Sequence, residues 1–184
     1  AAGSLRRHAA ASQAVAENGA WLLSLAAAGD GPAMPQAEAA EVPWILAALM
    51  RSHRGDASVQ EQGCRAVYAF SERGSGAPGA MASSMGSAGL VRGLQTAMRL
   101  HANSAPVQSA AAAALESLVR QCRANQQAAH DLGVAAEVWT AVRSHPAMAA
   151  REEADSLLRL LGSPLLDDTG LRGEEDGAEP CVVE

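Results

Sequence analysis

The chain has 184 residues, of which 48% are hydrophobic and only 3% aromatic, and its formal net charge is −6. Residues 1–166 are neutral overall, because the C-terminal segment 167–184 carries seven acidic residues against one arginine. A neutral body with an acidic tail lacks the basic surface that nucleic-acid binding requires. The scarcity of aromatic residues favours helices over strands. No apolar run reaches the roughly 18–20 residues of a membrane span, so neither nucleic acid nor a membrane is an expected partner.

A short pattern of an apolar residue, arginine, any residue and histidine recurs four times along the chain. The histidines are 45, 48 and 44 residues apart. A fixed period of this length is typical of α-solenoids built from repeats of two or three helices. The four copies end at His8, His53, His101 and His145.

After each histidine, apolar or small residues recur at positions i, i+4, i+7, i+8 and i+11. This spacing predicts one buried stripe on a long helix. The second position is always glycine or alanine, which lets a neighbouring helix approach closely. We expect the four stripes to face a common core; they run from Val15 to Ala26, from Val59 to Phe70, from Val107 to Leu118 and from Ala150 to Leu161.

Before three of the histidines a second helix is expected, and Pro43 suits the first turn of the earliest of these. Shorter helices are predicted upstream of two of them, and Gly133 suits the C-terminal end of one. The glycine- and serine-rich run 71–89 predicts a loop with a weakened helix from Met81. The expected second helices span 44–51, 90–100 and 134–144, and the short ones 36–41 and 124–132.

Two segments carry a resemblance to armadillo repeats. Residues 18–26, Asn-Gly-Ala-Trp-Leu-Leu-Ser-Leu-Ala, are similar to the N-A-A-W-A-L-S-N-L-A of a typical third helix, and residues 56–66 resemble its D-x-x-V-Q-x-x-A-x-x-A start. The resemblance covers residues 4–162. It implies a right-handed α-solenoid of about four armadillo-like repeats, the first incomplete. The expected repeats are approximately 1–28, 33–72, 81–121 and 124–162, in a domain of residues 1–163 followed by an acidic disordered tail over 164–184.

The chain departs from the family at the asparagine that follows the serine in S-N-L-A. In peptide-binding armadillo proteins this asparagine forms a ladder that holds the main chain of an extended peptide. The aligned positions hold no asparagine, so we expect a folded or helical partner recognised through its side chains. These positions are Leu25, Ala69, Ser117 and Leu160.

The long helices line the concave groove of armadillo proteins, and the resemblance places candidate partner-binding residues there. They are Asn18, Trp21, Gln62 and Arg65, from the first two repeats. Tryptophan and arginine are frequent anchors of protein interfaces, although Trp21 could instead pack over the adjacent repeat. Ala110 and Ala113 hold the equivalent places of the third repeat and offer little for a partner to bind.

No motif for catalysis or for a phosphate-binding loop is present, so we expect neither an enzyme nor a cofactor. The column of histidines suggests a metal ladder, but helices about 8–10 Å apart cannot share an ion held at about 2 Å. Each histidine is instead expected to cap the carbonyls of its own helix, beside an arginine that serves the same end or bridges repeats. His130 and Asp131 have no neighbouring nucleophile. Three isolated cysteines, Cys64, Cys122 and Cys181, indicate a reducing, cytoplasmic compartment and no zinc site.

The sequence therefore predicts a non-catalytic scaffold that presents a concave helical surface to a protein partner. The alternative is a structural appendage or regulatory segment of a larger multidomain protein, for example a kinase-like one, that packs on its own neighbouring domain. Because residue 1 falls inside a repeat, we expect a C-terminal fragment of a longer protein. The apolar stripe of Leu5, Val15, Leu22 and Leu23 would then lack its cover, which predicts self-association.

Overall fold

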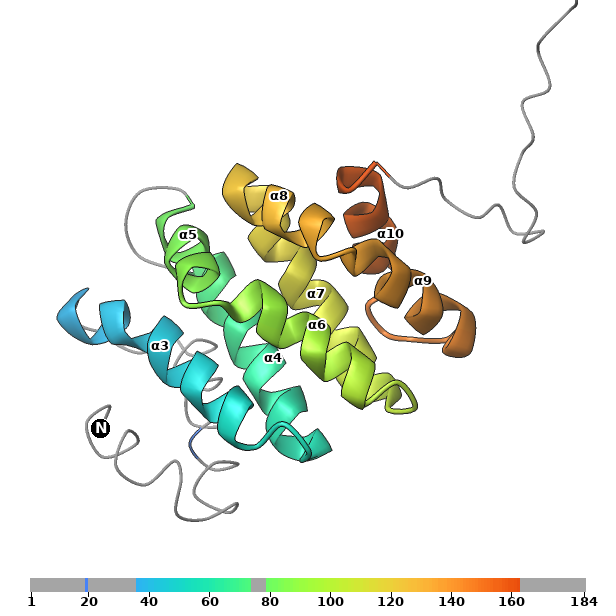
Figure 1. The fold of residues 1–184 in the computed structure, drawn as a ribbon, viewed down its shortest axis with the longest axis horizontal. Coiled ribbons are helices and arrows are strands. Elements are labelled where there is room, and N and C mark those ends of the chain that lie inside the picture. Colours follow the sequence, from blue (N-terminus) through green and yellow to red (C-terminus); the bar gives the residue numbers. More distant parts are fainter. Residues whose placement is uncertain (1–18, 20–35, 74–78, 163–184) are drawn as a thin grey trace, which may run out of the picture.

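In the computed structural model, the described residues are 19, 36–73 and 79–162 (Figure 1). Within these ranges the chain forms eight α-helices and no strand, which confirms the expected all-α class for this part. The helices are α3 (Gln36–Ser52), α4 (Ala57–Arg73), α5 (Ala80–Ser87), α6 (Leu90–Leu100), α7 (Ala105–Gln121), α8 (Arg123–Asp131), α9 (Val134–Ser144) and α10 (Arg151–Leu160). The acidic tail and, apart from Gly19, the first expected repeat lie outside these residues.

The helices pack in two rows with a pair at one end. Helices α3, α6 and α9 lie side by side toward the viewer in Figure 1, with α4, α7 and α10 behind them and α5 beside α8. Helix α7 occupies the centre, where it contacts α4, α5, α6, α8, α9 and α10. None of the described helices is long and apolar enough to cross a membrane.

Three of the four expected stripes form the core between the two rows. All stripe residues of α4 and α7 are buried, and those of α10, from Ala150 to Leu161, are at most 9% exposed. The small residue at the second stripe position serves close packing, since a Cβ on Gly63 would lie 2.8 Å from Cγ of Met50. Of the first stripe only Gly19 is described, and it is helical and buried.

Helices α6 and α9 have the bounds expected from the sequence, but α3 does not. Gly89 and Gly133, with φ of +84° and +70°, turn the chain at the starts of α6 and α9. Glu41 of α3 occupies the position that aligns with Gly89 and Gly133. All described residues with positive φ are glycines, so the chain makes no such turn at Glu41. The helix therefore continues through Pro43, which has no N–H to donate within the helix, and the two separate helices expected here are wrong.

Candidate functional site

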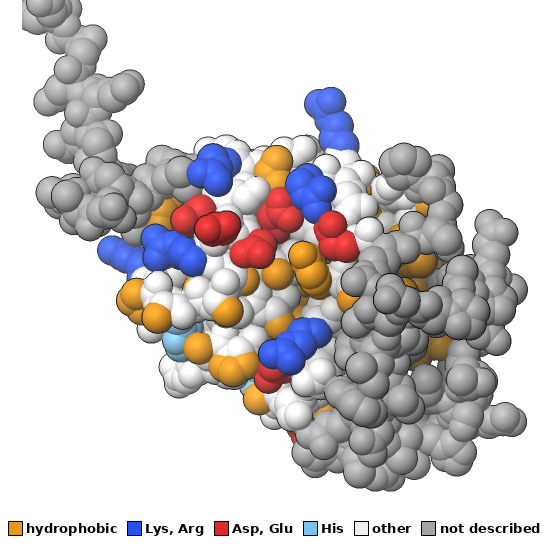
Figure 2. Space-filling model, turned by 180° about the vertical axis from the view of Figure 1, so that it is seen from behind, with side chains coloured by type: hydrophobic (Ala, Val, Ile, Leu, Met, Phe, Trp, Pro, Cys, Tyr) orange, Lys and Arg blue, Asp and Glu red, His pale blue; other side chains and the backbone are white. Residues whose placement is uncertain are grey.

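A groove of about 530 Å³ crosses α7 between α4 and α10. Its floor includes Ala110 and Ala113 of α7, whose small side chains leave space between the flanking helices. Arg65 and Tyr68 line it from α4, and Glu153 lines it from α10, beside the loop 147–150. Figure 2 shows this side of the molecule, where apolar side chains border a group of acidic and arginine side chains.

The structure brings some of the sequence-predicted site residues to this groove and not others. Arg65 lines it, together with Ala110 and Ala113 and with Glu153, which holds the equivalent place in the fourth expected repeat. Gln62 is half-buried and does not line it, while Asn18 and Trp21 lie outside the described residues. Ala110 and Ala113, which were expected to offer little for a partner to bind, line the groove, and their small side chains leave its space open.

Tyr68 is a groove residue with a large side chain that sequence reasoning missed. Its side chain is exposed beside Arg65, with a relative accessibility of 39% for the whole residue. The signal was available, since Tyr68 follows Arg65 by three residues and therefore shares its helix face. Arg65 pairs with Glu61 at 2.7 Å but keeps 58% of its side chain exposed, so it remains accessible to a partner.

Beyond the alanine floor, a polar cluster joins the three long helices. Arg120 of α7 pairs with Glu72 of α4 at 2.5 Å and with Glu116 of its own helix at 3.2 Å, and Ser156 of α10 donates to Glu116 at 3.1 Å. Burial alone would lower the pKa of Arg120, but the two carboxylates outweigh it and raise that pKa. The cluster therefore holds these charges in place within the fold.

Ser117, one of the positions aligned with the family's asparagine, is used inside the same cluster. It is fully buried and hydrogen bonds Ser71 at 2.6 Å and Glu72 at 2.5 Å. A side chain engaged in this way is not available to hold the main chain of an extended peptide.

We call the boundary between α3–α4 and α5–α7 the first junction, and that between α5–α7 and α8–α10 the second junction. At the first, Nε2 of His101 contacts the carbonyl oxygen of Arg54 at 2.9 Å; at the second, Nε2 of His145 contacts that of Ala102 at 2.8 Å. Arg54 and Ala102 occupy the same repeat position. The expectation that these rings cap their own helices is wrong, because each ring bonds the preceding loop instead.

Two glutamines that the sequence analysis overlooked cap the C-terminal ends of α3 and α6. Nε2 of Gln60 donates to the carbonyls of Met50 and His53, both at 2.9 Å. Nε2 of Gln108 does the same for Met98 and His101, at 2.8 and 2.9 Å. Both glutamines are buried and follow a histidine by seven residues, and this repeated spacing was the signal that could have identified them.

The described residues contain no group of three or more His, Cys, Asp or Glu side chains that could hold a metal ion. Cys64 is a free thiol whose pKa is raised to about 12, chiefly by burial and further by Glu61. Such a thiol is inert at neutral pH. His130 and Asp131 lie 3.8 Å apart and are both largely exposed.

Comparisons with protein-family models, with curated proteins and with solved structures find no match to this chain. The groove and the two junctions must therefore be interpreted from their own geometry.

Proposed function

We propose that this chain is a non-catalytic protein-interaction module whose groove over α7 binds a protein partner. The observation that carries the proposal is the groove itself. It combines a small-residue floor with an exposed arginine and an exposed tyrosine, the residue types that dominate interface energetics. A reducing compartment, the cytoplasm, is part of the proposal, because the buried Cys64 and the half-buried Cys122 are both free thiols.

The proposal includes a right-handed α-solenoid with armadillo-like repeats. It is supported by features that recur in register at successive junctions. Stripe residues are buried in the same pattern on three long helices, a left-handed glycine starts both α6 and α9, and histidine-to-carbonyl contacts join successive loops. Units that repeat such contacts stack on their neighbours.

The groove favours a folded or helical partner of defined chemistry. An apolar side chain fits over Ala110 and Ala113, where the floor offers only methyl groups. An acidic group on one side of that anchor would meet Arg65, and a basic group on the other would meet Glu153. Since Ser117 is already bonded within the fold, recognition through the partner's side chains is favoured over capture of its main chain.

The test is a selection of helical peptides on the full chain, followed by measured affinities for variants. Ala113→Glu fills the groove floor, and Ala136→Glu places the same side chain at an exposed position of α9 as the matched control. We expect selected peptides to lose roughly thirtyfold in affinity or more with Ala113→Glu and with Arg65→Ala/Tyr68→Ala, as for interface hot spots of about 2 kcal/mol. They should bind the control as they bind the wild type.

Equal binding to Ala113→Glu and the control, with both variants folded, would contradict the proposed site. A selection that yields no peptide at all would favour the alternative, in which the groove is covered by a neighbouring domain of a larger protein.

A further inference from the structure

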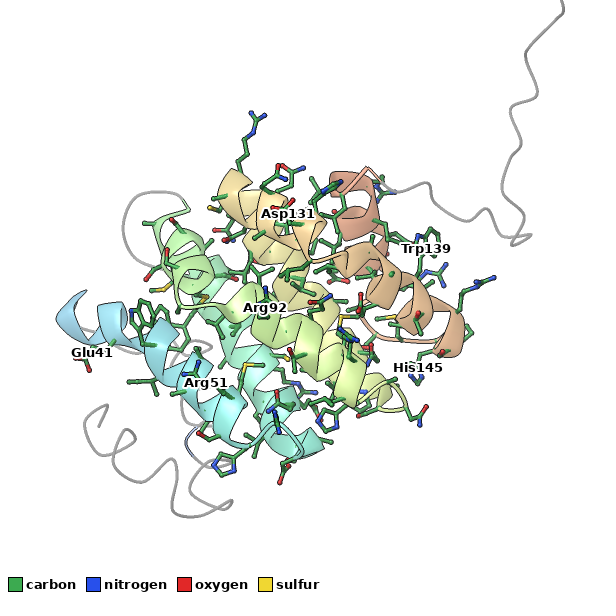
Figure 3. All side chains as sticks on the ribbon, viewed as in Figure 1. Glu41, Arg51, Arg92, Asp131, Trp139 and His145 are labelled. Atoms are coloured by element: carbon green, nitrogen blue, oxygen red, sulfur yellow. The ribbon has the colours of Figure 1, made fainter. Side chains whose placement is uncertain are left out.

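A second pocket, of about 330 Å³, lies at the first junction between α3 and α6, on the face seen in Figure 1. Three exposed arginines line it, Arg51, Arg54 and Arg92. Figure 3 shows Arg51 and Arg92 on these neighbouring helices. No acidic residue lines the pocket, and none of the three arginines takes part in the ion pairs found among the described residues.

The same site recurs one unit later, as a pocket of about 290 Å³ at the second junction between α6 and α9. Here Arg99, which aligns with Arg51, has a carboxylate within the pocket. Its Nε lies 3.6 Å from Oε1 of Glu137, and Gln95 donates to the same oxygen at 3.3 Å. The second junction therefore neutralises its arginine with a side chain of the protein itself.

The first junction lacks that carboxylate and carries more positive charge. Gly93 holds the position of Glu137, and a Cβ added there would meet no atom within 4 Å. Two further arginines, Arg54 and Arg92, replace the alanines Ala102 and Ala136 of the second junction. Three like charges thus surround an open space at the place where the neighbouring repeat puts an anion.

We propose that this pocket binds the phosphate group of a small organic monoester. Three guanidinium groups match the charge and the several acceptor oxygens of a phosphate better than those of one carboxylate. The N-terminal end of α6 also lines the pocket, and its first N–H groups receive no side-chain cap. Apolar atoms of Ala47 and Ala88 lie beside the arginines, and the volume suits a small ligand.

The experiment is a titration of the full chain with inorganic phosphate and, separately, with phenyl phosphate, followed by NMR at the amides of Gly89 and Gly93. We expect saturable shifts with both probes and tighter binding of phenyl phosphate, because its ring can contact the apolar wall. Arg51→Gln and Arg92→Gln should each weaken binding roughly tenfold or more, as expected for a lost charge-assisted hydrogen bond. Arg99→Gln, at the aligned position of the second junction, should leave it unchanged.

Gly93→Glu gives the sharpest variant, because it supplies the carboxylate that the second junction already has. It should abolish the binding of both probes. Gly93→Gln adds a side chain of the same shape as glutamate but without the charge, and it should retain most of the binding. Shifts that do not saturate, or that persist in Gly93→Glu as in Gly93→Gln, would overturn the proposed site. Equal affinity for the two probes would overturn the organic ligand and leave a site for inorganic phosphate alone.

Discussion

The first and second junctions share their backbone contacts and differ in their charges. Both are joined by a histidine ring that bonds the carbonyl of the preceding loop. The second adds an internal pair between Arg99 and Glu137, whereas the first has arginines around Gly93 that form no ion pair with a described residue. Contacts to the backbone position neighbouring groups of helices, whereas the other residues at each junction can differ in charge while the packing is kept. The differences between the two junctions are therefore where function is best sought.

The largest expected effect tests whether the two junctions share one core. Leu115 of α7 lies between both junctions and Leu158 of α10 borders only the second, and both are fully buried. Replacing either by alanine should lower the free energy of unfolding by about 2–5 kcal/mol. We expect the larger loss for Leu115→Ala in urea unfolding, since α7 contacts both flanking long helices. Losses below about 0.5 kcal/mol at both positions would contradict the common core.

The next effect concerns the glutamines that cap α3 and α6, each within its own group of helices. Gln108→Ala leaves the carbonyls of Met98 and His101 without this donor and should cost about 1–3 kcal/mol of stability. Gln60→Ala should cost a similar amount at the C-terminal end of α3. Gln62→Ala, at a half-buried neighbour on α4, serves as the control and should change stability little. A cost at Gln60 no greater than at Gln62 would show that the cap does not stabilise α3.

Sequence reasoning succeeded where a local signal decides the structure. The starts of α6 and α9 follow from glycines that adopt positive φ, and their ends follow from the histidine pattern. It failed at Glu41, because nothing local distinguishes a helix that continues through Pro43 from one that begins there. The groove was only half predicted, since the hollow over Ala110 and Ala113 depends on how far apart α4 and α10 lie.

The arginine pocket could not be predicted at all, because Arg51 and Arg92 meet only through the packing of α3 on α6. The histidine contacts were misassigned for the same reason. A terminal ring can reach either its own helix or the preceding loop, and only the distance between loops decides which one it bonds.

A smaller effect comes from the buried thiol of Cys64 on α4. The pKa of buried Cys64 is raised from 9.0 to about 12, so in the folded state its thiol stays protonated where the unfolded chain ionises. The stability that the protonated Cys64 thiol contributes to the folded state is therefore complete below pH 9, and it is lost as the pH rises toward 12. Between pH 8 and 10 the wild type should lose about 1 kcal/mol more stability than Cys64→Ala. Guanidinium unfolding curves of both proteins at pH 8 and pH 10 measure this difference, and an equal pH dependence of the two would contradict it.

The smallest effect tests whether the two histidine contacts are equivalent. His101→Phe and His145→Phe each remove one hydrogen bond to a loop carbonyl near the surface, which should cost about 0.5–1 kcal/mol. Because Arg54 and Ala102 occupy the same repeat position, the two costs should agree and should add in the double variant, since the contacts lie at different junctions. His130→Phe, on the exposed end of α8, is the control and should leave the unfolding midpoint unchanged. A marked cost at one junction alone would mean that the packing of the helices depends on the junction, and the histidine contact would then not be an element that the two junctions share.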